Sequence, residues 1–368
     1  MRLAKVDESG LADAMGPVLA GRAAVAVVAA NAEPRVIGRL PQAVDGPGVV
    51  VWTSGSTGDP KAVWLRREAV LAAVEACHER LGGPGRWVCP LPLHNVAGLM
   101  TLARGLSAQG WRRCDPKLRQ LEGPVGRSHI SLVPAQLHSA LADSRIARAL
   151  AGFATVLLGG QGAPAALLDE AKRAGINVVT TYGMSETCGG CVYDGLPLNG
   201  VAVDFEAGGR VVLDTPTAFS GYLGEPELTA ETLDGHRVRT RDRGVWENGR
   251  LRVLGRLDDV VVSGGVNVDL AGLQARCDEL WGVDEANRVV VFGIPDQRWG
   301  TSVVATTRRA ATLDEIREAL GPTCGPAALP KQLRRAVGPR PALAGKIRRG
   351  ALAAQWQKGD DGDTSGVD

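Results

Sequence analysis

The chain has 368 residues, of which 45% are hydrophobic and 22% are charged, and its formal net charge is +2. This length allows two domains with sizeable cores, and the composition is ordinary for a globular protein in water. No apolar run reaches membrane-spanning length, the first residues carry acids where a signal peptide is apolar, and only 4% of residues are aromatic. We therefore expect a cytoplasmic protein that binds neither a membrane nor a nucleic acid.

Strands and helices are predicted to alternate along the first half of the chain. Residues 1–48 contain a helix-like start and a strand at 23–30, and apolar residues at helical spacing predict a helix at 66–81. The alternation continues with a strand, a helix and a strand at residues 155–158, 165–174 and 176–180. This rhythm predicts an α/β core with a mostly parallel sheet.

The pattern changes after residue 192. Over residues 192–255 no helical pattern is found, and short strands with turn signals predict a small β-rich subdomain. Within it, Asn248-Gly249 suits a type I′ turn between two strands. We assign this subdomain to a large first domain of residues 1–256.

A smaller, mobile α+β domain is predicted over residues 257–357. It contains predicted strands at 288–292 and 301–307, and Thr312 with Glu315 forms a capping box that starts a helix. The polar, glycine-rich tail at 358–368 is predicted to be disordered.

The most informative stretch is Thr53-Ser-Gly-Ser-Thr-Gly-Asp-Pro-Lys61, which follows an apolar, strand-like segment. Its glycines allow a tight turn, while its hydroxyls and backbone N–H groups can surround phosphate oxygens beside the charge of Lys61. The spacing of the glycines differs from that of the common nucleotide P-loop. The stretch predicts a polyphosphate site, with a ligand-free surface turn as the alternative. The predicted binding residues are Thr53, Ser54, Gly55, Ser56, Thr57, Gly58 and Lys61.

Five further stretches carry residues suited to a nucleotide substrate. Gly159-Gly-Gln161-Gly162 and Thr180-Thr-Tyr182-Gly-Met-Ser185-Glu186-Thr187 lie at or after predicted strands, where α/β proteins place ligand sites. The other three are Arg239-Thr-Arg241-Asp242-Arg-Gly244, Gly255-Arg256-Leu-Asp258-Asp259 with Ser263-Gly264-Gly265, and Gly345-Lys346. Taken singly, each is also typical of a turn or of a solvated charge cluster.

In this order, the loop and the five stretches resemble the acyl-adenylate-forming (AMP-binding) enzymes, over about Val49 to Ala353. The resemblance implies that residues 1–256 are the adenylate-forming domain and that the cofactors are ATP, Mg²⁺ and coenzyme A. It implies a small-molecule carboxylate as the substrate. The acid is joined first to AMP and then to a thiol.

The resemblance also implies roles for individual residues. Tyr182 stacks on adenine, Ser185 contacts the α-phosphate, and Glu186 is a catalytic residue that binds Mg²⁺, for which a carboxylate is a suitable ligand. Asp242 accepts hydrogen bonds from the ribose hydroxyls. Lys346 is the implied catalytic lysine, since its charge can neutralise the charge that develops at the α-phosphate. The remaining implied nucleotide- and CoA-binding residues are Gly160, Gln161, Thr181, Arg256, Ser263, Gly264 and Gly265.

Asp258 is implied to be the hinge about which the smaller domain turns, which brings residues 263–265 to the thiol channel. The implied acyl-pocket residues are His94, Asn95, Gly183, Gly189 and Gly190. The family usually has a histidine where Asn95 stands, and His94 comes just before it. Which of the two serves the pocket stays open.

Arg241 stands where the family pattern commonly has glycine, and the chain before the signature loop is short. Both features resemble the o-succinylbenzoate–CoA ligase branch, which implies 2-succinylbenzoate as the acid and a place in menaquinone biosynthesis. Two alternatives stay open: adenylation of another aryl or acyl carboxylate with transfer to CoA or a carrier-protein thiol, and a non-catalytic nucleotide-binding protein. The sequence leaves a homodimer open.

Two other features have a functional and a plain interpretation. Cys188 and Cys191 form a lone C-x-x-C among seven cysteines, a pattern that favours small pocket-lining side chains over a metal or redox site. Residues 331–349 hold seven basic residues and no acids. They predict attraction for the phosphates of ATP and CoA, with a solvated face as the alternative.

Overall fold

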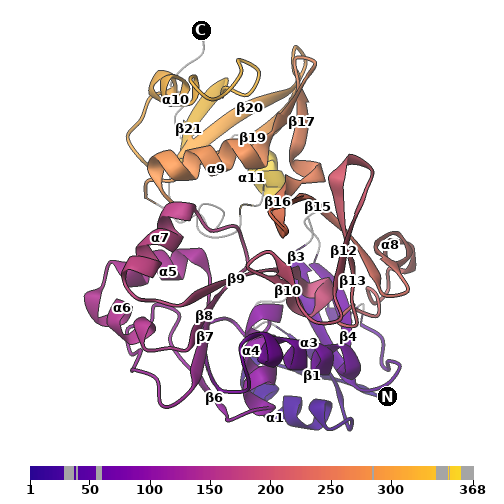
Figure 1. Cartoon of the computed structure of the whole chain (residues 1–368). Helices are drawn as coiled ribbons and strands as arrows, with labels where there is room; N and C mark the ends of the chain where they lie inside the picture. Colours follow the sequence, from indigo (N-terminus) through magenta and orange to yellow (C-terminus); the bar gives the residue numbers. More distant parts are fainter. Residues whose placement is uncertain are drawn as a thin grey trace. The chain divides into compact units, whose positions relative to one another are not determined.

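In a computed structural model, the residues described are 1–28, 37–38, 40–54, 60–283, 286–336, 347 and 349–357. They fall into two compact units (Figure 1). The described residues up to Thr240 form the first unit together with 246–252, and residues 241–245 and those from Val253 onward form the second. Within the described residues, no helix combines the length and the apolarity that a bilayer-spanning segment needs.

The first unit begins with a four-stranded sheet in the order β1-β2-β3-β4. Its strands are β1 (Leu3–Val6), β2 (Ala24–Val27), β3 (Gly48–Ser54) and β4 (Pro60–Arg66). The first three run parallel, and β4 returns antiparallel to β3. The helix-like start predicted for the chain is wrong for its first residues, because β1 pairs with β2 before helix α1 (Glu8–Leu19) begins. This pairing is a tertiary contact that local periodicity does not reveal.

A seven-stranded sheet in the order β11-β10-β9-β8-β7-β5-β6 follows. Strands β5 to β9 are parallel, and β10 and β11 are antiparallel additions. The strands are β5 (Arg86–Cys89), β6 (Trp111–Arg113), β7 (Ser128–Leu132), β8 (Thr155–Leu158), β9 (Val178–Met184), β10 (Gly189–Tyr193) and β11 (Leu196–Pro197). The parallel α/β core is therefore confirmed.

Helices connect and cover these strands. They are α3 (Arg67–Arg80), α4 (Val96–Leu106), α5 (Pro134–Leu141), α6 (Ser144–Ala151) and α7 (Ala165–Arg173). The helices predicted at 66–81 and 165–174 are confirmed to within a residue at each end. Residues from α1, α3 and α4 form one apolar core with residues of the first sheet, for example Leu11, Val70 and Leu99, all fully buried.

The β-rich region is a third sheet in the order β12-β13-β15-β14, with β16 paired to β15. Its strands are β12 (Ala202–Glu206), β13 (Arg210–Asp214), β14 (Leu233–Asp234), β15 (Arg237–Glu247) and β16 (Arg250–Arg256). Asn248 and Gly249 have φ angles of 52° and 72°, which confirms the predicted I′-type turn. The expectation that no helix occurs here is wrong, since α8 (Pro226–Thr232) forms two turns with Pro226 at its start.

The second unit contains a sheet in the order β18-β17-β20-β19, with β21 paired to β20 (Figure 1). Its strands are β17 (Val260–Ser263), β18 (Val266–Asp269), β19 (Val289–Asp296), β20 (Gly300–Thr307) and β21 (Gln332–Arg335). Its helices are α9 (Leu270–Trp281), α10 (Leu313–Leu320) and α11 (Arg349–Gln357). The Thr312–Glu315 capping box is confirmed by reciprocal hydrogen bonds of 2.7 and 3.2 Å.

Alternation along β19 explains how this sheet is covered on both faces. Val289 and Val291 pack in a core with α9 and α10, whereas Val290 and Phe292 pack in another with Trp356 of α11. Successive side chains of a strand point to opposite faces, so a continuous apolar run is buried on both.

Candidate functional site

The two ends of the predicted phosphate loop are held together by a strand pair. Thr53 on β3 lies opposite Lys61 on β4 in the antiparallel register. Ser54 closes β3. Gly55, Ser56, Thr57 and Gly58 lie outside the described residues. The sheet therefore fixes where the loop leaves and returns, and Lys61 is partly exposed at that point.

The predicted nucleotide residues of the first unit lie at the carboxyl ends of two neighbouring parallel strands. Gly160 and Gln161 follow β8, and Thr181 and Tyr182 lie on β9, which pairs with β8. A Cβ atom at Gly159 would lie 2.5 Å from the hydroxyl of Thr181, so this turn packs directly on β9. Such an edge is where α/β proteins bind ligands.

The segment after β9 is rigidly held. Ser185 and Glu186 belong to the short 3₁₀ helix η1 (Ser185–Thr187). The buried Thr187 hydroxyl accepts a hydrogen bond from the Met184 N–H at 3.0 Å and donates to the Gly189 carbonyl at 2.8 Å. A Cβ atom at Gly183 would lie 2.0 Å from that same carbonyl oxygen. The close approach of β9 and β10 therefore requires glycine at position 183, whether or not this residue also lines the implied acyl pocket.

His94 has a partner in the first helix. Its Nδ1 lies 2.7 Å from Oε1 of Glu8, its backbone N–H donates to the same oxygen, and Arg113 contacts the other oxygen at 3.4 Å. Burial would raise the pKa of Glu8, but the hydrogen bonds from His94 and the charge of Arg113 leave it lowered. Asn95 occupies the N-cap of α4. His94 is therefore a loop histidine whose ring is held by a carboxylate.

In the second unit, several predicted residues contact one another. Arg256 binds Asp258 in a bidentate pair of 2.7 and 2.8 Å, and Arg241 lies 3.7 Å from the same carboxylate. The hydrogen bond to Asp258 is the main cause of a raised pKa for Arg256, and the charge of Asp242 adds to it. Arg256, the implied nucleotide contact, and Asp258, the implied hinge, thus form an ion pair. The pair lies within electrostatic reach of Asp242, the implied ribose acceptor.

The predicted thiol-channel residues form the turn between β17 and β18. Ser263 is fully buried, and its hydroxyl has no hydrogen-bond partner among the described residues. Gly264 has a φ of 58°, and a Cβ atom there would lie 2.7 Å from the Trp299 ring. This turn therefore needs glycine at 264. Lys346 lies outside the described residues.

Arg349, three positions after Lys346, is described and is anchored inside the unit. Its guanidinium contacts Asp259 at 2.6 Å and donates to the carbonyls of Leu270 and Val291. Both charged side chains are more than 80% buried. Burial raises the pKa of Asp259, and the charge of Arg349 opposes that shift only in part. At least this member of the basic stretch is committed to an internal ion pair.

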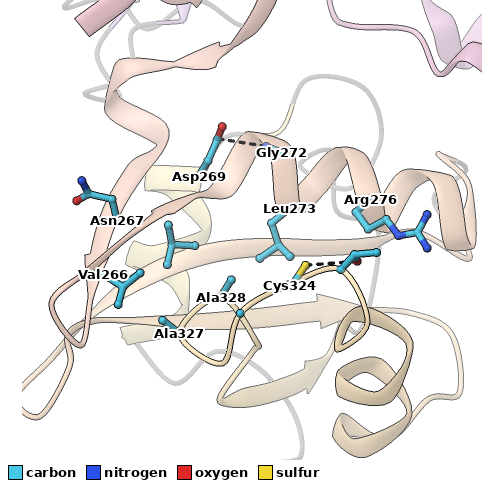
Figure 2. Close-up of a pocket in the computed structure, with 12 residues that line it drawn as sticks. Val266, Asn267, Asp269, Gly272, Leu273, Arg276, Cys324, Ala327 and Ala328 are labelled. Carbon is cyan, nitrogen blue, oxygen red and sulfur yellow. Dashed lines mark hydrogen bonds between the residues drawn. The ribbon is translucent and has the colours of Figure 1, made fainter.

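A groove of about 370 Å³ lies in the second unit, against α9 and β18 (Figure 2). Its walls include Asp269, Arg276 and Cys324, and none of its twelve lining residues is a predicted site residue. The walls are mostly small or aliphatic, and Arg276 is the single basic residue among them. The groove therefore lacks the charges that a polyphosphate requires.

The C-x-x-C pair belongs to the core. Cys188 and Cys191 are fully buried, and burial raises the pKa of Cys191 to about 12. No group of three or more metal-ligating side chains occurs in the part of the chain that the structure describes. The two thiols pack among apolar side chains.

Two residues that sequence reasoning missed are Tyr222 and Arg104. The Tyr222 hydroxyl donates to Oε1 of Glu186 at 2.7 Å. Arg104 is 3% exposed, lies over the Trp87 ring at 5.2 Å and contacts the Tyr193 hydroxyl at 3.5 Å. No ion pair joins Arg104 to a carboxylate among the described residues. Arg104 could have been singled out from the sequence as the lone charge of the apolar helix α4, whereas nothing in the local sequence singles out Tyr222.

Comparisons with known proteins bear on this site. Residues 16–222 match the model of the AMP-binding enzyme family. A Mycobacterium tuberculosis protein named probable 2-succinylbenzoate–CoA ligase is 39% identical over 334 residues, which cover 85% of each chain. A Geobacillus 2-succinylbenzoate–CoA ligase is 31% identical over 325 residues, 78% of this chain and 65% of the relative.

Solved structures show the same fold. A point variant of Escherichia coli MenE with bound OSB-AMS has a TM-score of 0.77 at 24% identity, covering 97% of this chain and 88% of that one. Bacillus subtilis o-succinylbenzoate CoA synthetase with its acyl-adenylate OSB-AMP has a TM-score of 0.74 at 20% identity, covering 99% and 84%.

Proposed function

Because the chain belongs to the AMP-binding enzyme family, we propose that it is an ATP- and Mg²⁺-dependent 2-succinylbenzoate–CoA ligase that works through an acyl-adenylate. The observation that carries the proposal is the 39% identity to a relative of that name over 85% of both chains. The arrangement of Lys61, Glu186 and the β8–β9 edge supports it. ATP and CoA are substrates of the cytoplasm, where we propose that the enzyme acts.

The first step uses residues of the first unit together with Lys346. The substrate carboxylate attacks the α-phosphate of ATP, the bond to the β-phosphate breaks, and pyrophosphate leaves. Lys61 and the hydroxyls of the signature loop hold the leaving group, and Lys346 bridges the carboxylate and the α-phosphate. Holding both reactants in place can lower the barrier by about 7–11 kcal/mol.

Glu186 fits the role of Mg²⁺ ligand by its chemistry. Its carboxylate is partly exposed, and Tyr222 engages only Oε1. Carboxylate oxygens beside phosphate are the ligands that Mg²⁺ prefers. When bound, the ion would offset charge on the phosphate oxygens.

In the second step, the CoA thiol attacks the carbonyl carbon of the acyl-adenylate, the bond to the phosphate oxygen breaks, and AMP leaves. We propose that the second unit turns about Asp258 between the steps, which withdraws Lys346 and presents the turn at 263–265. Both side chains of the Arg256–Asp258 ion pair are about one-third exposed, so breaking the pair costs little.

Arg104 supports a substrate with two carboxylates. A buried cation without an anionic partner is costly, and 2-succinylbenzoate keeps one carboxylate that is not activated. One residue links the implied acyl pocket to this cation: a Cβ atom at Gly190 would lie 3.0 Å from the ring of Tyr193, whose hydroxyl contacts Arg104. We propose that Arg104 recognises the second carboxylate.

Pyrophosphate release across a panel of acids, with ATP and Mg²⁺, tests the substrate. The panel contains 2-succinylbenzoate, two analogues that each lack one of its carboxylates, fatty acids and plain aryl acids. We expect 2-succinylbenzoate to give the highest kcat/KM, and Arg104→Gln to lower that value about 10–100-fold while sparing one of the analogues. Equal or better turnover of a fatty or plain aryl acid by the unchanged enzyme would overturn the assignment.

The same assay separates the alternatives. Thioester formation with CoA distinguishes the ligase from an enzyme that loads a carrier-protein thiol. Detection of acyl-AMP by mass spectrometry distinguishes either enzyme from a non-catalytic nucleotide-binding protein. Light scattering of the purified protein decides whether it is the homodimer that the sequence leaves open.

A further inference from the structure

Tyr222 contacts two charged side chains of the first unit, Glu186 and Lys61. Its hydroxyl donates to Glu186 at 2.7 Å, and the Nζ atom of Lys61 lies 5.4 Å from the centre of its ring. The side chain is only 8% exposed. One buried ring thus contacts the carboxylate through its hydroxyl and the ammonium through its π face.

The backbone around Tyr222 is fastened to both elements that carry these charges. Residues 220–223 hydrogen-bond to β4 on either side of Val63, which itself bridges to Tyr222. Phe219 N–H donates to the Glu186 carbonyl at 2.9 Å. Tyr222 therefore keeps a fixed position relative to the strand of Lys61 and to the helix of Glu186.

Lys61 and Glu186 carry opposite charges and contact the same tyrosine, and two such charges attract each other toward a direct ion pair. Such a pair would compete with the metal for Glu186 and with phosphate for Lys61. No ion pair joins the two side chains among the described residues. The Tyr222 side chain satisfies each charge weakly and separately, so that both stay available for a ligand.

We propose that Tyr222 is a positioning residue that keeps Glu186 aimed at the metal and Lys61 aimed at the phosphates, and prevents the two from pairing. The inference rests on the proposed roles of these two residues. It adds a third side chain to the proposed phosphate site.

Two substitutions separate the two contacts. Tyr222→Phe keeps the ring over which Lys61 lies and removes the hydroxyl. Tyr222→Leu removes both contacts. The matched control is Thr229→Val, because the Thr229 hydroxyl accepts a hydrogen bond from the Tyr222 N–H at 2.9 Å and touches neither charge. Thermal unfolding of all three variants measures the purely structural cost.

The readout is equilibrium binding of ATP by calorimetry, with excess Mg²⁺ and with EDTA, without any acid present. For Tyr222→Phe we expect the Mg²⁺-dependent gain in affinity to fall about tenfold, with metal-free binding unchanged. For Tyr222→Leu we expect metal-free binding to weaken as well. Thr229→Val should bind as the unchanged protein does, even where its melting temperature falls.

The outcomes separate this inference from the proposed function. Unchanged Mg²⁺ dependence in Tyr222→Phe, or an equal loss with and without metal, overturns the positioning role while the ligase activity stands. If the unchanged protein binds MgATP normally but does not turn over 2-succinylbenzoate, the assignment of the substrate is overturned. The Mg²⁺ dependence of ATP binding by Tyr222→Phe still decides the positioning role. Failure of the unchanged protein to gain ATP affinity from Mg²⁺ overturns both.

Discussion

The two units hold their predicted functional residues in different ways. In the first unit, Glu186 and Tyr182 follow or lie on a strand whose neighbours are fixed by backbone hydrogen bonds and by glycine packing at Gly183. In the second, Asp258 and Asp259 are held by arginine side chains. Backbone ladders give one geometry, whereas side-chain ion pairs can exchange partners. The comparison predicts that the first unit provides a rigid binding surface and that the second unit is able to reorient.

Loss of the lysine amine should have the largest effect. Lys346→Ala is expected to lower the rate of acyl-AMP formation about 10²–10³-fold or more, because the cation at the developing charge is removed. Conversion of preformed acyl-AMP to the thioester should be spared. The two half-reactions are measured separately by pyrophosphate release and by CoA consumption. An equal loss in both steps would contradict the idea that the second unit presents different residues in each.

Removal of Arg349 tests whether the second unit depends on ion pairing. Arg349→Met leaves Asp259 and the carbonyls of Leu270 and Val291 without this partner, which should lower the free energy of unfolding by about 2–3 kcal/mol. Urea unfolding measures it. The control is Arg335→Met, an exposed arginine of β21 in the same unit. Equal stability of the two variants would show that the buried pair adds nothing.

Acid should weaken the first unit through His129. The imidazole is fully buried, and burial, aided by the charges of Arg127, His78 and Arg104, lowers its pKa to about 4. The unfolded chain then binds a proton that the folded chain does not, so stability is complete above pH about 6.5 and is lost as pH falls toward 4. The expected loss is about 2–3 kcal/mol.

His129→Phe should flatten this dependence. Phenylalanine keeps a ring beside Trp87, whose centre lies 5.0 Å away, and removes two ring nitrogens that have no partner among the described residues. Melting temperatures between pH 4 and 7 give the comparison. A slope as steep as that of the unchanged protein would assign the acid sensitivity to other groups, such as His78, whose pKa burial also lowers.

The smallest effect on stability is expected at the hinge. Asp258→Asn removes the partner of Arg256, but both side chains are about one-third exposed, so the free energy of unfolding should change by less than about 1 kcal/mol. If Asp258 is the hinge, thioester formation should slow more than adenylation. A large loss of stability would show that the pair is a structural support of the second unit.

Much of the local structure was predictable because its determinants lie close together in the sequence. The capping box joins Thr312 to Glu315, and the I′ turn needs only Asn248 and Gly249. The missed helix α8 is too short for periodicity to be read, and β1 exists because it pairs with β2. The signature loop and its lysine were recognisable for the same reason as the turns.

The partners of the site residues were not predictable in this way. His94 was compared with a family histidine, yet its ring is held by Glu8, 86 positions away. Tyr222 has no motif of its own, and its role depends on Glu186, 36 positions away. Arg104 could have been singled out as a lone charge in an apolar helix, but only its burial shows that no carboxylate pairs with it among the described residues.

By itself, the sequence determined the family, the order of the chemistry-bearing stretches and the local turns and caps, because each depends on residue types at short spacing. Only the tertiary structure decided which of these residues touch. Sheet order and strand register bring β4, η1 and Tyr222 together and set Arg349 against Asp259, 90 positions apart. Such contacts follow from how whole elements pack, and no short stretch of sequence contains that information.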